Sequence, residues 1–360
     1  MGEWKEYKLG DIISLGNGKV RPKETGNIPI YGGNGILGYC NSSNYDGETV
    51  IIGRVGAYCG SVYYENRPIW ISDNALAVKS KKGYSTKFIY YLLKKLKLND
   101  YAEGSSHPLI TQTLLNAIDV LFIDDIGEQK SIASILSSLD DKVDLLCREN
   151  STLEAMAEIL FNKTLYEKEN NGTIEQLISI QNGYAFKSKD FQEHGVNGVI
   201  KIKNISGGVI DVNKTDCIDI IRGISSKFKV HTGDILIAMT GAEVGKLGII
   251  PSTNKDLWLN QRVGMLIEKY PGSKYIAYLQ LKSDYGQDFI ENAATGSAQP
   301  NISSSAIENC GFPLLAASEI KALAYQLEGL YEKIIHNLGH INGLKLLRND
   351  LLLKLMNSQV

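Results

Sequence analysis

The chain has 360 residues, of which 43% are hydrophobic, so it is long enough to form two or three domains with their own cores. Its formal net charge of −2 argues against a protein that coats nucleic acid by charge alone, although binding within a larger complex stays open. No run of about 18 apolar residues is present, and residues 1–11 lack the apolar core of a signal peptide, so we expect a cytoplasmic protein. The five cysteines have no paired spacing, which predicts neither a disulfide framework nor a zinc site.

Short β-like runs at the start of the chain predict a first globular domain of mixed α and β structure. These runs occupy residues 49–53, 61–64 and 74–80, between Gly-rich loops. An amphipathic helical pattern follows at residues 85–97. Together they predict an α/β or α+β fold class for this part of the chain.

The stretch that opens with residues 128–143 carries the clearest helical pattern. Its seam positions alternate spacings of four and three residues, which is typical of a coiled coil. They are Ile132, Leu136, Leu139, Val143, Leu146, Asn150, Leu153, Ala157 and Leu160. This pattern predicts a long helix with a partner helix.

The second half repeats this order of a globular domain and a helix. Its β-like runs occupy residues 199–205, 234–240 and 264–269, and an amphipathic helix is predicted at residues 273–290. A second seam follows, with Arg348 in its one charged position. The other positions of that seam are Leu323, Leu327, Leu330, Ile334, Asn337, Ile341, Leu344 and Leu351.

Each predicted helix places one asparagine in its seam, Asn150 in the first and Asn337 in the second. A polar seam residue lowers stability but fixes register, so we interpret both as alignment devices. The alternative is that both reach solvent at a frayed part of the seam. Because one chain holds both helices, we expect them to pair with each other as an antiparallel coiled coil about 50 Å long.

The two halves also share a local sequence pattern. Residues 47–64 (GETVIIGRVGAYCGSVYY) lie over residues 233–250 (GDILIAMTGAEVGKLGII) with one single-residue shift. Trp70 then corresponds to Trp258, and residues 104–110 correspond to residues 296–302. A repeat of nearly half the chain implies a duplicated domain pair with pseudo-two-fold symmetry.

The segment GAEVGKLG at residues 241–248 does not satisfy the pattern of a phosphate-binding P-loop. Only three residues separate Gly241 from Gly245, and Leu247 stands where the magnesium-binding hydroxyl should be. We interpret the segment as a strand-to-strand turn whose glycines supply turn geometry. Gly56 and Gly60 have the same role in the first half.

No complete catalytic motif accompanies these patterns. The sequence has no Asp/Asn-Pro-Pro-Tyr/Phe for amino methylation and no dinucleotide-binding GxGxxG after a strand. His336 and His340 have the spacing of metal ligands on a helix, but the Glu of a zinc-protease helix is missing. We therefore expect no catalytic residue, no cofactor and no metal in this chain.

The layout and the quoted segments together resemble the DNA-specificity subunits of type I restriction-modification systems. Residues 3–18 (EWKEYKLGDIISLGNG) are similar to the start of that family, and residues 170–186 (NNGTIEQLISIQNGYAF) are similar to the start of its second recognition domain. The resemblance implies two target recognition domains, residues 1–125 and 169–315, each followed by a helix, residues 126–168 and 316–360. The differing segments at residues 26–39 and 197–208 suggest that the two domains read different sequences.

The resemblance also implies the DNA target and the partner subunits of the chain. It would bind double-stranded DNA at a bipartite site, with an unread spacer set by the coiled coil, and catalyse nothing itself. Two methyltransferase subunits would modify adenines with S-adenosylmethionine, and motor-endonuclease subunits would cut the DNA. The modest net charge is consistent with partners that neutralise part of the phosphate charge.

Candidate DNA-reading residues are side chains in loops that suit base edges or phosphates. In the first domain they are Lys19, Arg21, Lys23, Arg54, Ser105, Ser106 and His107. In the second domain they are Lys187, Lys201, Lys203, Lys246, Gln261, Arg262, Ser297 and Gln299. Arg262 suits a guanine, whereas Asn74 at the corresponding position suits an adenine.

Alternatives stay open at this point. Each lysine could be an ordinary solvated surface charge, and Arg262 with Asn74 could only brace the fold. The whole chain could be a coiled-coil scaffold that spaces partner proteins without binding DNA. An autonomous nuclease or methyltransferase would need catalytic residues that the sequence does not offer.

Overall fold

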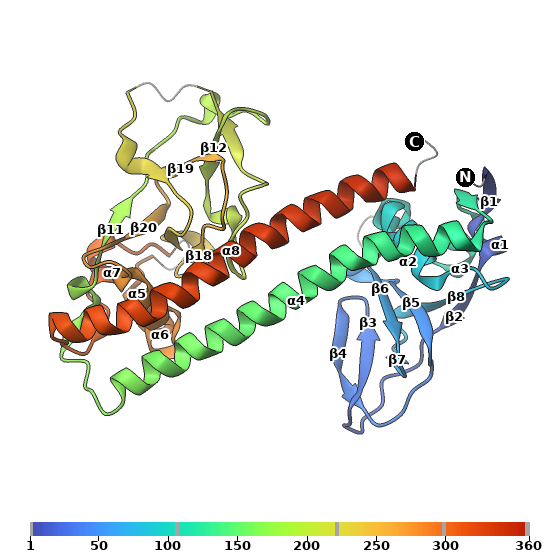
Figure 1. Ribbon diagram of the computed structural model, residues 1–360, viewed down its shortest axis with the longest axis horizontal. Coiled ribbons are helices and arrows are strands. Elements are labelled where there is room, and N and C mark those ends of the chain that lie inside the picture. Colours follow the sequence, from blue (N-terminus) through green and yellow to red (C-terminus); the bar gives the residue numbers. More distant parts are fainter. Residues whose placement is uncertain (1–2, 105–107, 220–222, 297–299, 357–360) are drawn as a thin grey trace. The chain divides into compact units, whose positions relative to one another are not determined.

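The computed structural model describes residues 3–104, 108–219, 223–296 and 300–356. The chain forms two compact units, unit 1 with residues 1–142 and 344–360, and unit 2 with residues 143–343. Each unit combines a globular part of helices and strands with sections of two long helices (Figure 1). The mixed fold class with two globular parts and two long helices is therefore confirmed. Among the helices of the described ranges, none has the length and hydropathy needed to cross a membrane.

Unit 1 is built around a four-stranded antiparallel sheet in the order β2-β8-β5-β6, with a three-stranded sheet β4-β3-β7 and a pair β1-β9 beside it. Its strands are β1 Trp4–Lys8, β2 Ile13–Asn17, β3 Ile28–Gly32, β4 Gly35–Cys40, β5 Glu48–Gly53, β6 Val62–Asn66, β7 Trp70–Ile71, β8 Ala75–Ser80 and β9 Asp119–Ile123. Its short helices are α1 Leu9–Ile12, η1 Gly56–Tyr58, α2 Thr86–Lys95, η2 Leu98–Tyr101 and α3 Gln112–Ala117.

Helix α2 covers one face of the four-stranded sheet. Phe88 and Leu92 of this helix are buried in one cluster with Val50 and Val78 of the sheet. The helix begins after Ser85, whose hydroxyl accepts a hydrogen bond from Phe88 N at 3.2 Å. The helix predicted at residues 85–97 is confirmed.

Unit 2 contains a six-stranded sheet in the order β11-β20-β17-β18-β14-β13 and a four-stranded sheet β15-β12-β19-β16. Its strands are β10 Gly172–Thr173, β11 Ile178–Asn182, β12 Asn197–Ile200, β13 Ile205–Ser206, β14 Gly208–Ile210, β15 Asp216–Ile218, β16 Lys229–Val230, β17 Ile235–Ala238, β18 Leu247–Ile249, β19 Asp256–Leu259, β20 Val263–Glu268 and β21 Gly311–Phe312. Its short helices are η3 Ile174–Gln176, η4 Ser188–Asp190, η5 Ile202–Asn204, η6 Ser226–Phe228, η7 Gly241–Glu243, α5 Ser273–Lys282, α6 Asp284–Ala293 and α7 Ser304–Glu308.

The single helix predicted at residues 273–290 is wrong, because the structure divides it into α5 and α6. Ser283 between them is extended, with φ −63° and ψ 158°, and its hydroxyl accepts a hydrogen bond from Gly286 N at 3.1 Å. Serine competes with the helical backbone in this way and caps a new helix instead. Gly286 also lies so close to Gln280 that an added Cβ would be 2.1 Å from its carbonyl oxygen.

The duplication that the sequence indicates is present in the backbone hydrogen bonds. Gly60 N donates to Gly53 O at 2.8 Å, and Gly245 N donates to Ala238 O at 2.9 Å. In both units this bond closes a turn between antiparallel strands, β5 and β6 in unit 1 and β17 and β18 in unit 2. The turn glycines have positive φ, which other residues rarely adopt, at Gly56 (75°), Gly60 (87°), Gly241 (79°) and Gly245 (85°). GAEVGKLG is therefore a strand-to-strand turn.

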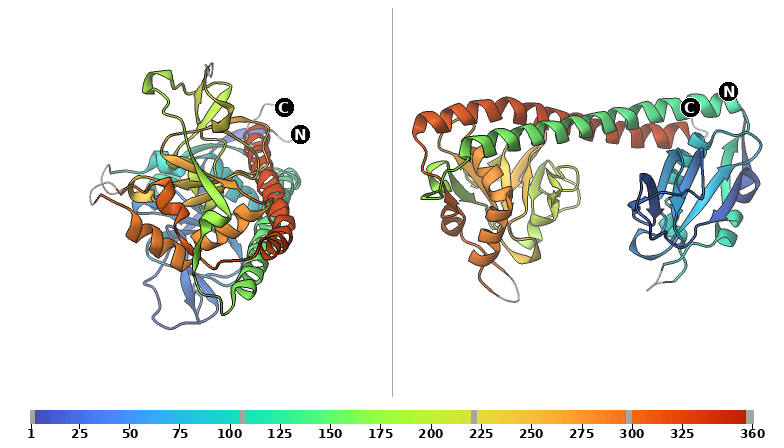
Figure 2. Two further views of the ribbon diagram at one scale, coloured as in Figure 1. Left: turned by 90° about the vertical axis from the view of Figure 1, so that its left-hand side faces the viewer. Right: turned by 90° about the horizontal axis from the view of Figure 1, so that it is seen from below.

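The long helices are α4 (Ile126–Leu165) and α8 (Ala317–Leu355), and their paired sections lie side by side (Figure 2). In unit 2, Ala157 and Phe161 of α4 are buried in one cluster with Leu323 and Leu327 of α8. Ala157, Leu323 and Leu327 are seam positions that the heptad-like spacing predicts, whereas Phe161 is buried beside the predicted position Leu160.

The two seam asparagines bind each other. Asn337 Nδ2 donates to Asn150 Oδ1 at 2.9 Å and to Glu149 Oε2 at 3.0 Å. Asn150 is 7% exposed and Asn337 is fully buried. The alternative that both reach solvent is therefore wrong, and the alignment interpretation is supported.

The charged seam residue Arg348 has a partner in unit 1. Its Nη1 lies 2.6 Å from Asp140 Oδ1, and the other oxygen of Asp140 accepts a hydrogen bond from Tyr91 at 2.8 Å. Asn337 of α8 binds Asn150 of α4, and Arg348, which lies later in α8, binds Asp140, which lies earlier in α4. The two helices therefore run antiparallel.

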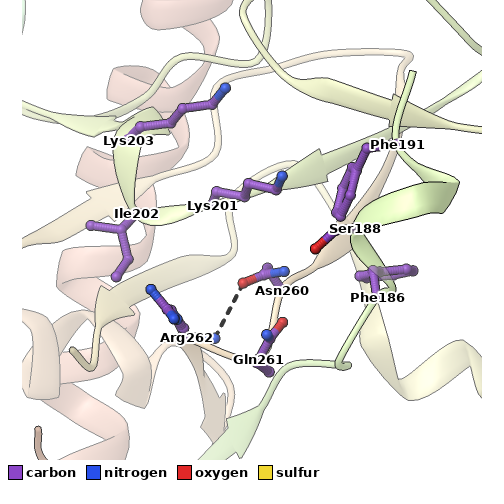
Figure 3. Close-up of a pocket in the computed structure, with 9 residues that line it drawn as sticks. All are labelled: Phe186, Ser188, Phe191, Lys201, Ile202, Lys203, Asn260, Gln261 and Arg262. Carbon is purple, nitrogen blue, oxygen red and sulfur yellow. Dashed lines mark hydrogen bonds between the residues drawn. The ribbon is translucent and has the colours of Figure 1, made fainter. Parts of the chain in front are cut away.

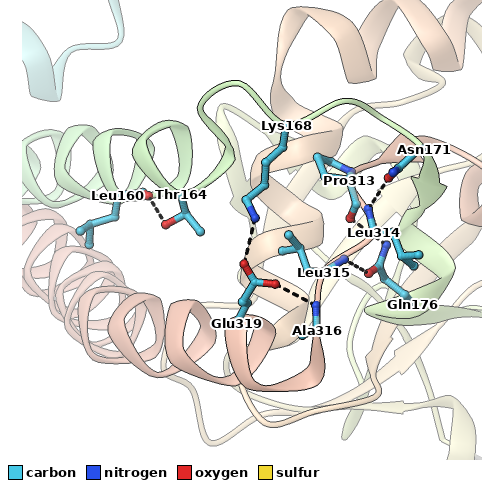
Figure 4. Close-up of polar contacts among 10 residues, drawn as sticks. All are labelled: Leu160, Thr164, Lys168, Asn171, Gln176, Pro313, Leu314, Leu315, Ala316 and Glu319. Atoms are coloured by element: carbon cyan, nitrogen blue, oxygen red, sulfur yellow. Dashed lines mark hydrogen bonds and ion pairs between the residues drawn. The ribbon is translucent and has the colours of Figure 1, made fainter.

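Polar contacts close the junction where α4 ends and α8 begins (Figure 4). Lys168 Nζ lies 2.8 Å from Glu319 Oε1, and Glu319 Oε2 accepts a hydrogen bond from Ala316 N at 3.0 Å. Glu319 thus satisfies a free N–H at the start of α8, where negative charge is favoured. Gln176 binds the same segment through Pro313 O and Leu315 N.

We predict that replacing one seam asparagine lowers the free energy of unfolding more than replacing both does. In Asn337→Leu the buried amide of Asn150 loses its partner, which should destabilise the protein by about 1–3 kcal/mol. In the double variant with Asn150→Leu, no unpaired amide is left, so stability should recover. Urea unfolding of the full chain measures the difference.

Asn342→Leu, on α8 outside the seam, is the matched control and should have little effect. A double variant that is less stable than Asn337→Leu alone would contradict the account of the seam.

Candidate nucleic-acid interface

A cavity of about 350 Å³ in unit 2 gathers several of the side chains singled out from the sequence. We call it the Lys201 pocket (Figure 3). Three segments line it, one after β11, one after β12 and one between β19 and β20. The lining residues are Phe186, Ser188, Phe191, Lys201, Ile202, Lys203, Asn260, Gln261 and Arg262.

Backbone hydrogen bonds hold these three segments together. Tyr184 N donates to Leu259 O at 2.8 Å, and Asn260 N donates to Ile200 O at 3.1 Å. Gly183 packs directly on Asn260, since an added Cβ would lie 2.1 Å from the Asn260 carbonyl oxygen. Main-chain contacts therefore position the segments that line the pocket.

The charge of the pocket is set by two lysines that share one carboxylate. Lys201 Nζ lies 2.7 Å and Lys203 Nζ 2.6 Å from the two oxygens of Asp216 on β15. Hydrogen bonds from Lys201 and then Lys203 lower the pKa of Asp216 below its ordinary value of 3.8. Arg262 adds a third cation to the pocket, so these four side chains carry an excess of positive charge.

The aromatic side of the pocket is formed by Phe186 and Phe191. Lys201 Nζ lies 3.4 Å from the centre of the Phe191 ring, and Figure 3 shows this side chain reaching toward that ring. A cation over a ring face is attracted by the ring quadrupole. Asp216 and Phe191 thus hold the Lys201 side chain, so its positive charge has a fixed position in the pocket.

Gln261 and Arg262 are the exposed donors of the pocket. Neither side chain has a hydrogen-bond or ion-pair partner among the residues that the structure describes, and Arg262 contacts Asn260 only through its backbone N–H at 3.4 Å. Glutamine and arginine are the residue types that bind adenine and guanine edges through two hydrogen bonds. An excess of positive charge beside free donors suits a nucleic acid.

The remaining candidates of unit 2 lie outside the Lys201 pocket. Lys187 lines a neighbouring cavity with Tyr184 and Asp190. Lys246 lines a third cavity with Gly207 and Gly208, and its ammonium group pairs with Glu243. Ser297 and Gln299 lie outside the described residues.

In unit 1, two of the candidates flank the turn between β7 and β8. Lys19 N donates to Ile71 O at 2.9 Å, and Arg54 N donates to Asn74 O at 3.0 Å. Arg21 donates to the carbonyl of Leu37 at 3.2 Å, so part of its guanidinium braces β4. Lys23 is exposed, and Ser105, Ser106 and His107 lie outside the described residues.

Sequence reasoning missed the carboxylate and the rings of the pocket. Asp216 is remote from Lys201 along the chain and is joined to it by the pairing of β12 with β15. Phe191 lies in a loop with no periodic pattern. Across the described ranges, His, Cys, Asp and Glu side chains form no group of three or more that could hold a metal ion.

Comparison with known proteins identifies one family. A family model for the type I restriction modification DNA specificity domain matches residues 1–155 and 166–345. The specificity subunit of the type I restriction enzyme EcoprrI from Escherichia coli is 32% identical over 161 residues, which are 42% of this chain and 40% of that protein. The MjaVIII specificity subunit from Methanocaldococcus jannaschii is 26% identical over 303 residues, covering 76% of this chain and 70% of that one.

A solved structure has the same fold. The crystal structure of the type I restriction-modification S subunit from M. genitalium matches with a TM-score of 0.66. The match covers 100% of this chain and 97% of that chain. At 16% sequence identity, this likeness concerns the fold alone.

We predict that the pairing of Asp216 makes stability depend on pH. Since the pKa of this carboxyl is depressed in the folded state, its contribution is complete above the unfolded value near 3.8 and is lost as the pH falls through the folded value. Asp216→Asn should therefore be less stable than the wild type at neutral pH, and the difference should shrink below about pH 4. Urea unfolding at a series of pH values measures this.

The control is Asp190→Asn, whose exposed carboxylate makes no hydrogen bond within the described part of the chain. A difference for Asp216→Asn that stays constant down to pH 2 would show that its ion pairs contribute nothing.

Proposed function

This chain belongs to the type I restriction-modification DNA specificity family, and we propose that it reads a bipartite DNA site, one half with each globular part. Recognition of specific DNA sequences is the activity that this family supports. In the finer proposal the chain is the non-catalytic subunit of a cytoplasmic complex. Two methyltransferase subunits modify adenines at the site, and motor-endonuclease subunits cut the DNA.

The Lys201 pocket is the observation that carries this proposal. Its lysines supply positive charge for phosphates, while Gln261 and Arg262 have no partner of their own among the described residues and offer donors to base edges. Phosphate contacts position a protein on DNA, whereas contacts to base edges select the sequence. The pocket holds both kinds of group within one cavity.

The two halves of the site should differ in sequence. Ile30 pairs with Trp70, and Val199 pairs with Trp258, so residues 32–34 of unit 1 correspond to residues 201–203 of unit 2. Unit 1 has Gly-Gly-Asn there, whereas unit 2 has Lys-Ile-Lys. The two units thus have the same strand pairing but different side chains at corresponding positions, which supports two half-sites of different sequence.

We assign the spacing of the half-sites to the pairing of α4 with α8. Each helix is continuous, with 40 residues in α4 and 39 in α8. The buried asparagine pair fixes which residues of the two helices face each other. A helix pair with fixed register is suited to hold two recognition domains at one distance.

A domain exchange tests the assignment of one half-site to each globular part. The full chain is produced with its partner methyltransferase, and residues 1–125 are replaced by the corresponding segment of a relative with a known target. Mapping of methylated adenines should show a change in one half of the motif only. A change in both halves would refute the modular assignment, and no motif in the wild-type complex would refute DNA reading and favour a scaffold.

An insertion tests the spacing role. Seven residues added to both helices, after Leu146 and after His340, keep the seam pattern and lengthen the pair by about 10 Å. The unread spacer should then grow by about three base pairs, since each pair rises about 3.4 Å. The control insertion in α4 alone breaks the register and should abolish methylation. An unchanged spacer in an active double insertion would show that the helices do not set the distance.

A further inference from the structure

The arginine side chains of the described residues fall into two groups. Four in the described ranges hydrogen-bond to other groups of the chain: Arg21 to the Leu37 carbonyl, Arg67 to Glu65, Arg148 to the Asp144 carbonyl, and Arg348 to Asp140. Arg54 and Arg262 differ, because neither guanidinium has a hydrogen-bond or ion-pair partner within the described residues. The Nε atom of Arg54 is buried and has no hydrogen-bond partner in the part of the chain that the structure describes.

These two arginines occupy the same place in the duplicated framework. The pairing of β5 with β8 ends at Gly53 and Ala75, and that of β17 with β20 ends at Ala238 and Val263. One residue further on, Arg54 N donates to Asn74 O at 3.0 Å, and Met239 N donates to Arg262 O at 3.0 Å. We call each of these two residue couples the terminal pair of its unit.

A second bond confirms the correspondence of the terminal pairs. Ile110 N donates to the carbonyl of Arg54 at 2.9 Å, and Ile302 N donates to the carbonyl of Met239 at 3.0 Å. Position 54 therefore corresponds to position 239, and position 74 to position 262. Each terminal pair holds one arginine, but the arginine stands on opposite strands in the two units.

The burial of the four residues in the terminal pairs is consistent with the exchange of arginine between the two positions. Met239 is 6% exposed and packs in the core of unit 2, whereas Arg262 opposite it is exposed in the Lys201 pocket. In unit 1 the half-buried Arg54 takes the place of the methionine, and the exposed Asn74 takes the place of Arg262. Residues opposite each other across antiparallel strands have Cα atoms about 4.5–5.5 Å apart. An arginine side chain is long enough to compensate for that offset.

From these observations we infer that the terminal pair is the guanine-reading position of each recognition domain, with Arg54 serving one half-site and Arg262 the other. The terminal Nη donors of a guanidinium without an internal partner stay free for the O6 and N7 atoms of a guanine. An arginine that braced the fold would instead bind a carboxylate or carbonyl, as the other four do. This inference rests on the proposed function and adds one determinant to each half-site.

The test uses the full chain assembled with its partner methyltransferase and a pool of DNA duplexes with about 30 randomised base pairs, longer than one specific site. Sequencing of the bound fraction should give two separate motifs for the wild type. Arg262→Ala should lose the preference for guanine at one base pair of one motif, and Arg54→Met at one base pair of the other. Each loss should reduce discrimination about 5- to 150-fold.

Two variants sharpen the experiment. Arg54→Met introduces the residue that unit 2 carries at this position, and adding Asn74→Arg recreates the residue pair of unit 2. This double variant should regain a guanine preference in the same half-site. Arg67→Ala is the control, because it removes an arginine of unit 1 that is paired with Glu65, and it should leave both motifs unchanged.

The outcomes separate the inference from the proposed function. A wild-type complex that enriches no sequence would refute DNA reading altogether. A wild type that enriches two motifs, with Arg54→Met and Arg262→Ala enriching the same ones, would overturn the inference alone. A uniform loss of affinity with a flatter salt dependence would also overturn it, since it would show that the arginines contact phosphate.

Discussion

The hydrogen bond between Asn150 and Asn337 is the constraint on which the arrangement of the two long helices depends. Both amides are buried, so any other register would leave them unpaired at a cost that the apolar seam does not offset. In unit 1, Arg348 of α8 pairs with Asp140 of α4. There Met356 is fully buried, and its carbonyl accepts a hydrogen bond from Lys95 at 2.6 Å.

A consequence is that the core of unit 1 contains residues from both ends of the chain. Leu351, Leu352 and Leu355 pack against the cluster that holds Leu9 and Phe88. The last turns of α8 therefore complete the apolar core of unit 1.

Within each unit, a glycine lets two main-chain segments approach closely at the same place in the framework. Gly18 packs on the carbonyl of Ser72 as Gly183 packs on that of Asn260, because a Cβ at either place would clash. The lysines of unit 2 and the glycines of unit 1 stand at corresponding places beside these contacts.

The sequence predicted the features that depend on backbone geometry and on regular spacing. The paired glycines predicted the turns, and the alternating apolar spacing predicted α4 and α8 with their asparagines. Features that depend on distant residues were not predictable. Nothing near Asp216 indicates that it binds Lys201 and Lys203. The break at Ser283, in contrast, has a local signal that the single-helix prediction did not use, since a serine followed by Asp284 in the first turn is typical of a helix start. The exchange of arginine across the terminal pair is visible only from the strand register.

The central claim is that one chain reads two separate stretches of DNA through the major groove. Methylation interference with dimethyl sulfate, which modifies the N7 atom of guanine in that groove, tests it most directly on the wild-type complex bound to its own target. The account predicts two groups of interfering guanines, separated by a spacer in which modification has no effect. A single continuous group, or no interference at any guanine, would contradict it.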